Sequence, residues 1–151
     1  MKLTVAGKIN IDSADLMAKN HGLGKYGPIQ MYIDNECIKL MEKYTPFESG
    51  FLSGPAVLAY TDIGSGKINQ HGPYARYLYY GEVYGPNIPL IIGGVLEGFY
   101  SPPHKEPTGR PLQYNTATHP LAGPFWFERM KADYKDRILA GAQEIARRLN
   151  K

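Results

Sequence analysis

Histidine, cysteine and serine are the residues from which hydrolytic or metal chemistry could arise. The histidines lie far apart in predicted loops, at His21, His71, His104 and His119. None of them has the i, i+4 or HxH spacing that lets two imidazoles meet one metal ion. No serine stands in a GxSxG elbow, and Cys37 falls on the apolar stripe of a predicted helix, where a thiol is buried and inert. These residues therefore predict neither a metal site nor a nucleophile.

Glycine strings and carboxylates give no stronger signal for catalysis. The glycines at 64–66 and 93–94 do not precede a helix as a phosphate-binding loop does, and hairpin turn chemistry accounts for them. Glu82, Glu97 and Glu106 stand in or near an irregular segment, where they are expected to be solvated. We therefore expect no catalytic residue, no cofactor and no metal. One enzymatic alternative stays open, a hydrolase that uses His119 and a glutamate; it requires both groups to converge in a concave pocket with shifted pKa values.

Aromatic residues are concentrated in two short segments, 74–84 and 125–127. Tyr77, Phe127 and Trp126 are expected in the core. The segments together hold more large rings than one face of a small helix can bury, so some rings should contact a partner. The candidate contact residues here are Tyr74, Arg76, Tyr79, Tyr80, Tyr84 and Trp126. For Trp126 contact with a partner is the second interpretation, after a place in the core.

Residues 85–109 form a proline-rich segment around the apolar string IPLIIGGVLEGFY. We predict a long loop that acts as an assembly clamp, because its apolar residues follow neither a helical nor a sustained alternating period. The alternative is that this apolar set folds back onto its own domain. The candidate contact residues of the loop are Ile91, Ile92, Leu96, Phe99 and Tyr100.

The elements that must position these residues follow from periodicity and from Gly and Pro. Residues 3–11 alternate as a half-buried strand within an N-terminal arm, 1–24. A helix begins at Gly27-Pro28 and ends before Pro46, with Ile33, Cys37, Leu40, Met41 and Tyr44 on one face. Residues 57–63 and 66–71 are predicted to form a hairpin.

The C-terminal half is predicted to hold a short helix over 74–80 closed by Gly81, a returning strand over 110–116, and a long helix after Gly123-Pro124. One face of the long helix carries Phe127, Met130, Tyr134, Ile138, Ala142, Ile145 and Leu149. The predicted fold is therefore α+β: a small antiparallel sheet packed by two main helices, with a long C-terminal helix and a long proline-rich loop. Residues 25–151 would form one domain, with 85–109 as an insertion.

Composition narrows the class of partner. The chain has 151 residues and a formal net charge of +3. Residues 125–151 hold seven Lys or Arg against four Asp or Glu, whereas the rest holds ten of each, so the whole excess lies on the last helix. This balance is too weak for a dedicated nucleic-acid binder, although a basic module that contacts DNA stays open as an alternative. A single cysteine fits folding in a reducing compartment, and no apolar run reaches the length of a signal peptide or membrane span.

Three strings occur in order along the chain. The first is Tyr44, Pro46, Ser49, Gly50 and Leu52, the second runs from Tyr74 to Gly81 as YARYLYYG, and the third is Ala122-Gly123-Pro124 before Trp126. From about residue 22 onward the chain resembles the minor capsid or neck proteins of long-tailed bacteriophages, the head-tail connector components grouped with tail-completion proteins. The segment IPLIIGGVLEGFYSPPHKE is longer than the corresponding region expected from this resemblance.

The resemblance implies a virion structural protein, made in the bacterial cytoplasm, that forms a ring between the capsid portal and the tail. Its partners would be other copies of itself, neighbouring connector or tail proteins, and DNA passing through the channel, with no membrane. Ring formation uses heterologous contacts repeated by rotation. The exposed aromatics and the proline-rich insertion independently favour partner binding, whereas the phage role depends on the resemblance alone.

Overall fold

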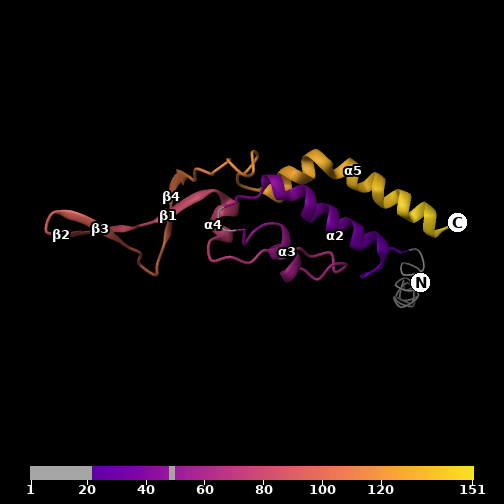
Figure 1. Cartoon of the computed structure of the whole chain (residues 1–151), viewed down its shortest axis with the longest axis horizontal. Helices are drawn as coiled ribbons and strands as arrows, with labels where there is room; N and C mark the ends of the chain where they lie inside the picture. The colour runs from indigo at the N-terminus through magenta and orange to yellow at the C-terminus, as the bar shows by residue number, and fades with distance from the viewer. Residues whose placement is uncertain (1–21, 48–49) are drawn as a thin grey trace, which may run out of the picture.

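The computed structural model describes residues 22–47 and 50–151. Its elements are, in order, α2 (Pro28–Met41), the 3-10 helix η2 (Glu42–Tyr44), α3 (Gly54–Tyr60), α4 (Ala75–Tyr80), β1 (Glu82–Gly85), β2 (Ile88–Ile92), β3 (Val95–Tyr100), β4 (Glu106–Pro111) and α5 (Trp126–Leu149). The helices form an elongated body, and the strands project from one end of it (Figure 1). The α+β class is confirmed. The predicted strand over 3–11 lies outside the described residues.

Helix α2 begins and ends where the sequence predicts. Pro28 occupies its first turn after Gly27, and Thr45, the residue before Pro46, is extended at φ −81° and ψ 133°. The predicted apolar face is the buried one: Cys37, Leu40, Met41 and Tyr44 enter the core, with Ile33 packed against it.

Helix α5 lies alongside α2 and completes the core. Trp126, Met130, Ile138 and Ala142 are its buried residues, which recur at the spacing of one helical face. The two helices approach closely at Gly141, where an added Cβ would lie 1.8 Å from the Tyr32 hydroxyl oxygen. On the exposed face, Arg148 Nε lies 3.0 Å from Glu144 Oε1, an i, i+4 ion pair.

Helix α3 replaces the hairpin predicted over residues 57–71. Val57, at 1% exposed, is a core residue of this helix, which carries a proline in its first turn. The loop after it is held by the buried carboxylate of Asp34. Its Oδ2 accepts from the backbone N–H groups of Gly64, at 2.7 Å, and Gly66, at 3.1 Å. The hairpin prediction is wrong because Ser53-Gly54-Pro55 is a helix-start signal that outweighs the β-branched residues behind it.

The strands occur where a loop was predicted. β1 pairs with β4 and β2 with β3, both antiparallel, in two separate two-stranded sheets. Gly93 and Gly94 both have positive φ, 60° and 83°, as a two-residue hairpin turn requires, so the turn chemistry assigned to this pair is confirmed. The prediction of an irregular loop over 85–109 is therefore wrong. The returning strand covers 106–111, whereas it was predicted over 110–116. Prolines are tolerated because a two-stranded sheet consists only of edges.

The short helix α4 connects the body to the strands. It is closed by Gly81, which has φ 72° and donates its N–H to the Tyr77 carbonyl oxygen at 2.9 Å, as predicted for this glycine. The helix begins at Ala75, so Pro73 lies in the preceding turn rather than in its first turn. A Cβ on Gly81 would meet the Pro124 ring at 2.7 Å, so the turn is also packed against the start of the C-terminal segment.

Candidate functional site

The hairpin of residues 88–100, made of β2 and β3, carries apolar side chains on both faces. Ile91 pairs with Leu96, and Ile92 with Val95. Successive pairs point to opposite faces of a sheet, so each face has an apolar pair. Ile91, Ile92 and Phe99 are 63%, 66% and 61% exposed. A soluble domain seldom leaves so large an apolar set in water unless another surface covers it.

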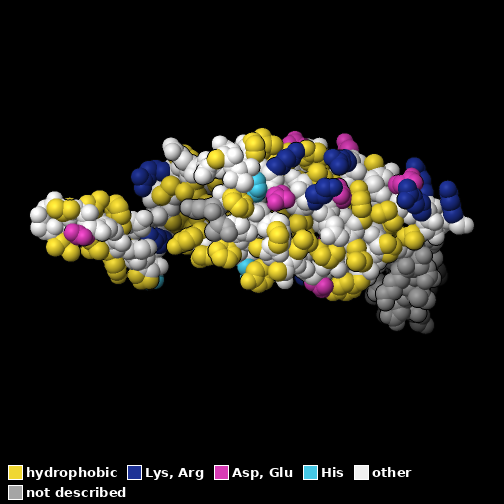
Figure 2. Space-filling model, in the orientation of Figure 1, with side chains coloured by type: hydrophobic (Ala, Val, Ile, Leu, Met, Phe, Trp, Pro, Cys, Tyr) yellow, Lys and Arg dark blue, Asp and Glu magenta, His cyan; other side chains and the backbone are white. Residues whose placement is uncertain are grey.

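The hairpin stands clear of the body. Within the described part of the chain, β2 and β3 pack chiefly against each other, and they project beyond β1, β4 and α4 (Figures 1 and 2). The alternative that this apolar set folds back onto its own domain is therefore wrong for this conformation. Of the predicted contact residues, Ile91, Ile92, Leu96, Phe99 and Tyr100 all lie here and are all exposed.

A groove of about 630 Å³ lies beside α4, at the end of the body from which the hairpin projects. Its walls come from the loop before α3, the turn before and first turns of α4, and the segment after β4. The lining residues are Pro46, Phe47, Gly50, Phe51, Leu52, Gly72, Pro73, Tyr74, Ala75, Leu78, Gln113, Tyr114 and Asn115, none of which is charged. The Tyr114 hydroxyl donates to the Leu78 carbonyl oxygen at 2.6 Å, and burial raises the pKa of this phenol. The site is thus apolar with a few fixed polar groups.

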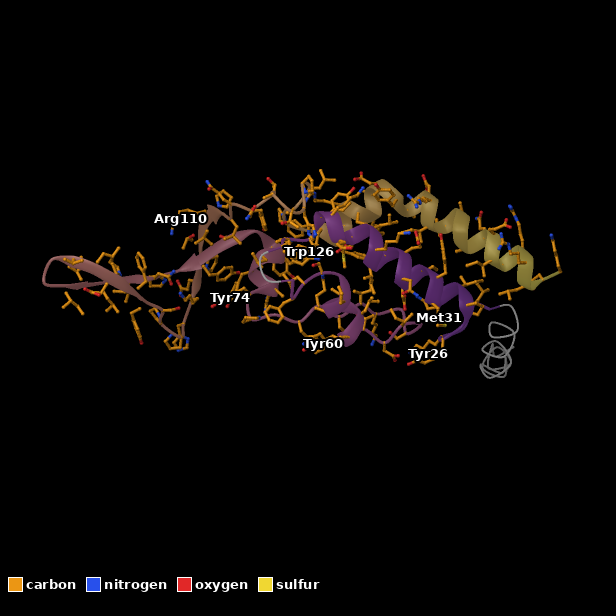
Figure 3. The ribbon with its side chains drawn as sticks, in the orientation of Figure 1. Tyr26, Met31, Tyr60, Tyr74, Arg110 and Trp126 are labelled. Carbon is orange, nitrogen blue, oxygen red and sulfur yellow. The ribbon has the colours of Figure 1, made fainter. Side chains whose placement is uncertain are left out.

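The predicted aromatic contact residues divide between surface and interior. Tyr74, Arg76 and Tyr80 are exposed. Tyr74 lines the groove and lies at the end of the body from which the hairpin projects (Figure 3). Tyr84 is half-buried, with its ring 4.7 Å from that of Tyr77. Tyr77 itself is half-buried, so its prediction as core is met only in part.

Trp126 and Tyr79 belong to the interior of the body. Trp126 is 2% exposed, its ring centroid lies 4.8 Å from that of Tyr79, and its Nε1 donates to Gln70 Oε1 at 2.9 Å. Burial and, secondarily, the charge of Glu128 raise the pKa of Tyr79. The prediction of Trp126 as a contact residue is wrong, because its ring fills the junction between α4 and α5; its prediction as core is confirmed.

The three sequence strings meet around this tryptophan. Gly123 donates its N–H to the Tyr44 carbonyl oxygen at 3.2 Å, and Phe125 donates to that of Tyr79 at 2.8 Å. Gln70, which accepts from Trp126, also donates to the Leu52 carbonyl oxygen at 2.6 Å. Residues far apart in the chain are thereby fixed to one another, so the strings that carry the phage resemblance are mainly determinants of the fold.

No protein-family model, no curated protein and no solved structure matches this chain. The function must therefore be argued from the surfaces themselves. Among the helices of residues 22–47 and 50–151, none has the length and apolar character of a membrane span.

A second pocket contains His119. Its volume is about 420 Å³, and it is lined by Lys39, Leu40, Glu42, Lys43, His119, Tyr134 and Arg137. His119 Nδ1 lies 2.6 Å from the Thr45 carbonyl oxygen, which can only accept, so Nδ1 carries the proton. The pocket does bring His119 and a glutamate together, as the hydrolase alternative requires.

None of the described residues that line this pocket is Ser, Thr or Cys, so a hydrolase built on His119 and Glu42 would have to use water as its nucleophile. Cys37 is buried elsewhere in the core, where burial raises the pKa of its thiol and disfavours the reactive thiolate. No group of three or more potential metal ligands occurs among the described residues. His119 instead packs its ring edge-on against Phe47, with centroids 5.2 Å apart, which is the environment of a structural histidine.

Sequence reasoning located the hairpin as an interaction segment but missed the groove. Its walls come from three stretches between Pro46 and Asn115 that only the fold brings together. Phe51 stands in a turn-rich string beside Leu52, and Tyr114 lies between Gln113 and Asn115, so the sequence marks neither position as part of a surface. Tyr74 is the one lining residue that the sequence placed among the candidate contact residues.

Proposed function

We propose that this chain is a virion structural protein of the phage head-tail connector, where it acts without catalysis by packing against other subunits in a ring. The observation that carries the assembly role is the hairpin of residues 88–100, which exposes apolar side chains on both faces and packs chiefly on itself within the described chain. The phage assignment adds the resemblance carried by the three sequence strings.

The structure offers a physical basis for such a component. The body has one continuous core between α2 and α5, with Met130 fully buried and the Trp126 ring held by a hydrogen bond to Gln70. A rigid body with a projecting apolar element can hold neighbours at a fixed angle, which is what a closed ring demands. The mechanism proposed is therefore geometric.

The test is to locate the chain in particles. An antibody raised against the recombinant chain should label tailed virions of the phage that encodes it at the junction of head and tail. Cryo-electron microscopy of those virions should show α2 packed beside α5 in a symmetric ring at that level. Absence of the chain from purified virions that contain portal and tail proteins would refute the proposal.

A second candidate function is contact with DNA, favoured by the basic residues gathered on α5. Lys and Arg side chains spread along the side of the molecule where α5 lies (Figure 2). Arg147 and Arg148 share the carboxylate of Glu144. A module of this kind binds duplex DNA with an affinity that falls steeply with salt. Fluorescence anisotropy with a labelled duplex, repeated at several salt concentrations, separates this candidate from a purely protein-contacting role.

A further inference from the structure

The hairpin and the groove are two surfaces of matching character on one chain. Eight large apolar residues of the hairpin are exposed: Ile88, Leu90, Ile91, Ile92, Val95, Leu96, Phe99 and Tyr100. Between residues 88 and 100 the only charged side chain is Glu97, and none of the described residues that line the groove is charged. Docking one surface against the other would therefore bury few charged groups without a partner. The burial of unpaired charge is the main cost of covering a surface.

The two surfaces are held apart within one chain. The strands β1 and β4, which join the hairpin to the body, are fixed by side-chain hydrogen bonds as well as by their own ladder. Thr108 Oγ1 donates to the Val83 carbonyl oxygen at 2.6 Å, and the Gly109 N–H donates to Glu82 Oε1 at 2.9 Å. The hairpin continues outward from these strands (Figure 1), so in this structure it points away from its own groove.

We propose that the hairpin of one copy docks in the groove of the next copy, as the ring contact of the assembly proposed above. The inference rests on that proposed function and names the partner as a second copy of this chain. The two surfaces differ, so the contact is heterologous and repeats around a ring instead of closing a two-fold dimer.

The sizes of the two surfaces agree with such a contact. A standard stable interface buries roughly 800 Å² on each partner, and somewhat more than half of that area is apolar. The eight exposed apolar side chains of the hairpin, each 46–66% exposed, would supply the apolar part of such a contact. The groove volume, about 630 Å³, admits the side chains of one hairpin face. Phe51 and Tyr74, which line the groove and are exposed, would contact that face.

Disulfide trapping tests the pairing directly. In a Cys37→Ser background, a tagged chain with Ile91→Cys is mixed at high concentration with an untagged chain with Gln113→Cys, and the mixture is oxidised mildly. We expect the tagged-untagged dimer to be the dominant product. Leu139→Cys, on the exposed face of α5, replaces Gln113→Cys as the matched control and should give little product.

Complementary variants test whether the contact is heterologous. Ile92→Asp should disable the hairpin and Tyr74→Asp the groove, and each variant alone should self-associate at least about tenfold more weakly than the parent, because docking would bury an unpaired carboxylate. Mixed together, they retain one intact hairpin and one intact groove, so sedimentation should show one-to-one dimers that do not grow further. A two-fold contact between hairpins would not be restored by mixing.

Dominant cross-linking of Ile91→Cys chains to each other, or no cross-link with the Gln113→Cys partner at high concentration, would overturn the inference. These results are distinguishable from failure of the proposed function. A trapped hairpin-to-groove dimer from a chain that is absent from virions would refute the phage role but not the contact between copies. A chain present in virions but never trapped in this way would show that its hairpin meets a different protein.

Discussion

Replacing residues 88–100 by a Gly/Ser linker of the same length should leave the body folded. The buried core residues all lie outside this segment, so the replacement removes no core contact. An isolated two-stranded hairpin is at best marginally stable, so its own loss costs little. The remaining cost is the entropy of closing a flexible loop between β1 and β4. Such costs change by only about 0.6 kcal/mol for a twofold change in loop length. We therefore expect the free energy of unfolding to fall by less than about 1 kcal/mol.

Urea denaturation followed by tryptophan fluorescence measures this change, because Trp126 is the only tryptophan and lies in the core. Met130→Ala is the matched control. Its side chain is fully buried, so truncation should cost about 2–5 kcal/mol while leaving the probe in place. The reasoning is refuted if the linker variant loses its cooperative transition or is destabilised as much as Met130→Ala. That result would make the hairpin part of the fold rather than a docking element.

Three further predictions concern the body and are checked by the same denaturation assay. Asp34→Ala should lower the free energy of unfolding by roughly 3–5 kcal/mol, since it leaves the backbone N–H groups of Gly64 and Gly66 in the loop after α3 unpaired. Asp34→Asn should lower it by less. Gly141→Ala should destabilise the protein by about 1–2 kcal/mol because the added Cβ overlaps the Tyr32 ring. In a Tyr32→Ala background the same change should stabilise the protein through helix propensity. Stabilisation in the parent would contradict the close approach of Tyr32 to Gly141. Burial, with a hydrogen bond to Asp133, raises the pKa of Tyr44 from 10.0 to about 12. The neutral phenol therefore makes its full contribution to the free energy of unfolding below pH 10. The difference in this free energy between the parent and Tyr44→Phe should shrink above pH 10 and disappear as the pH rises through 12. A difference that does not change with pH would count against this reasoning.

The sequence was informative where one face of an element is buried. In α2 and α5 the apolar residues recur at the helical period because the opposite face meets water, so both helices could be predicted. Of the face predicted for α5, Met130, Ile138 and Ala142 are buried, whereas Leu149 at its end is 47% exposed. Gly81 could be predicted as a helix end because only a residue that tolerates positive φ closes α4.

The sequence was uninformative where buried and exposed side chains do not alternate along an element. Ile91 and Ile92 are both apolar and both exposed, so the strand they form shows no period of two. The hairpin was hidden for the same reason that it is suited to docking: neither face is reserved for water. Helix α3 was missed for a different cause, since a seven-residue helix has too few turns to reveal a period. The groove depends on tertiary packing alone.

An exposed two-stranded sheet with apolar faces is a hazard for a free protein, because its edges and faces invite unspecific association. It is tolerable if the hairpin becomes ordered mainly when it docks. The ordering cost then reduces the strength of a single contact, and free chains associate weakly. In a closed ring each subunit makes one contact through its hairpin and one through its groove, so the last subunit to enter forms two contacts at once. The second of these is effectively intramolecular, which raises the apparent affinity without any new interaction. Weak single contacts and a stable ring are therefore compatible, because the closing step of such a ring makes its assembly cooperative.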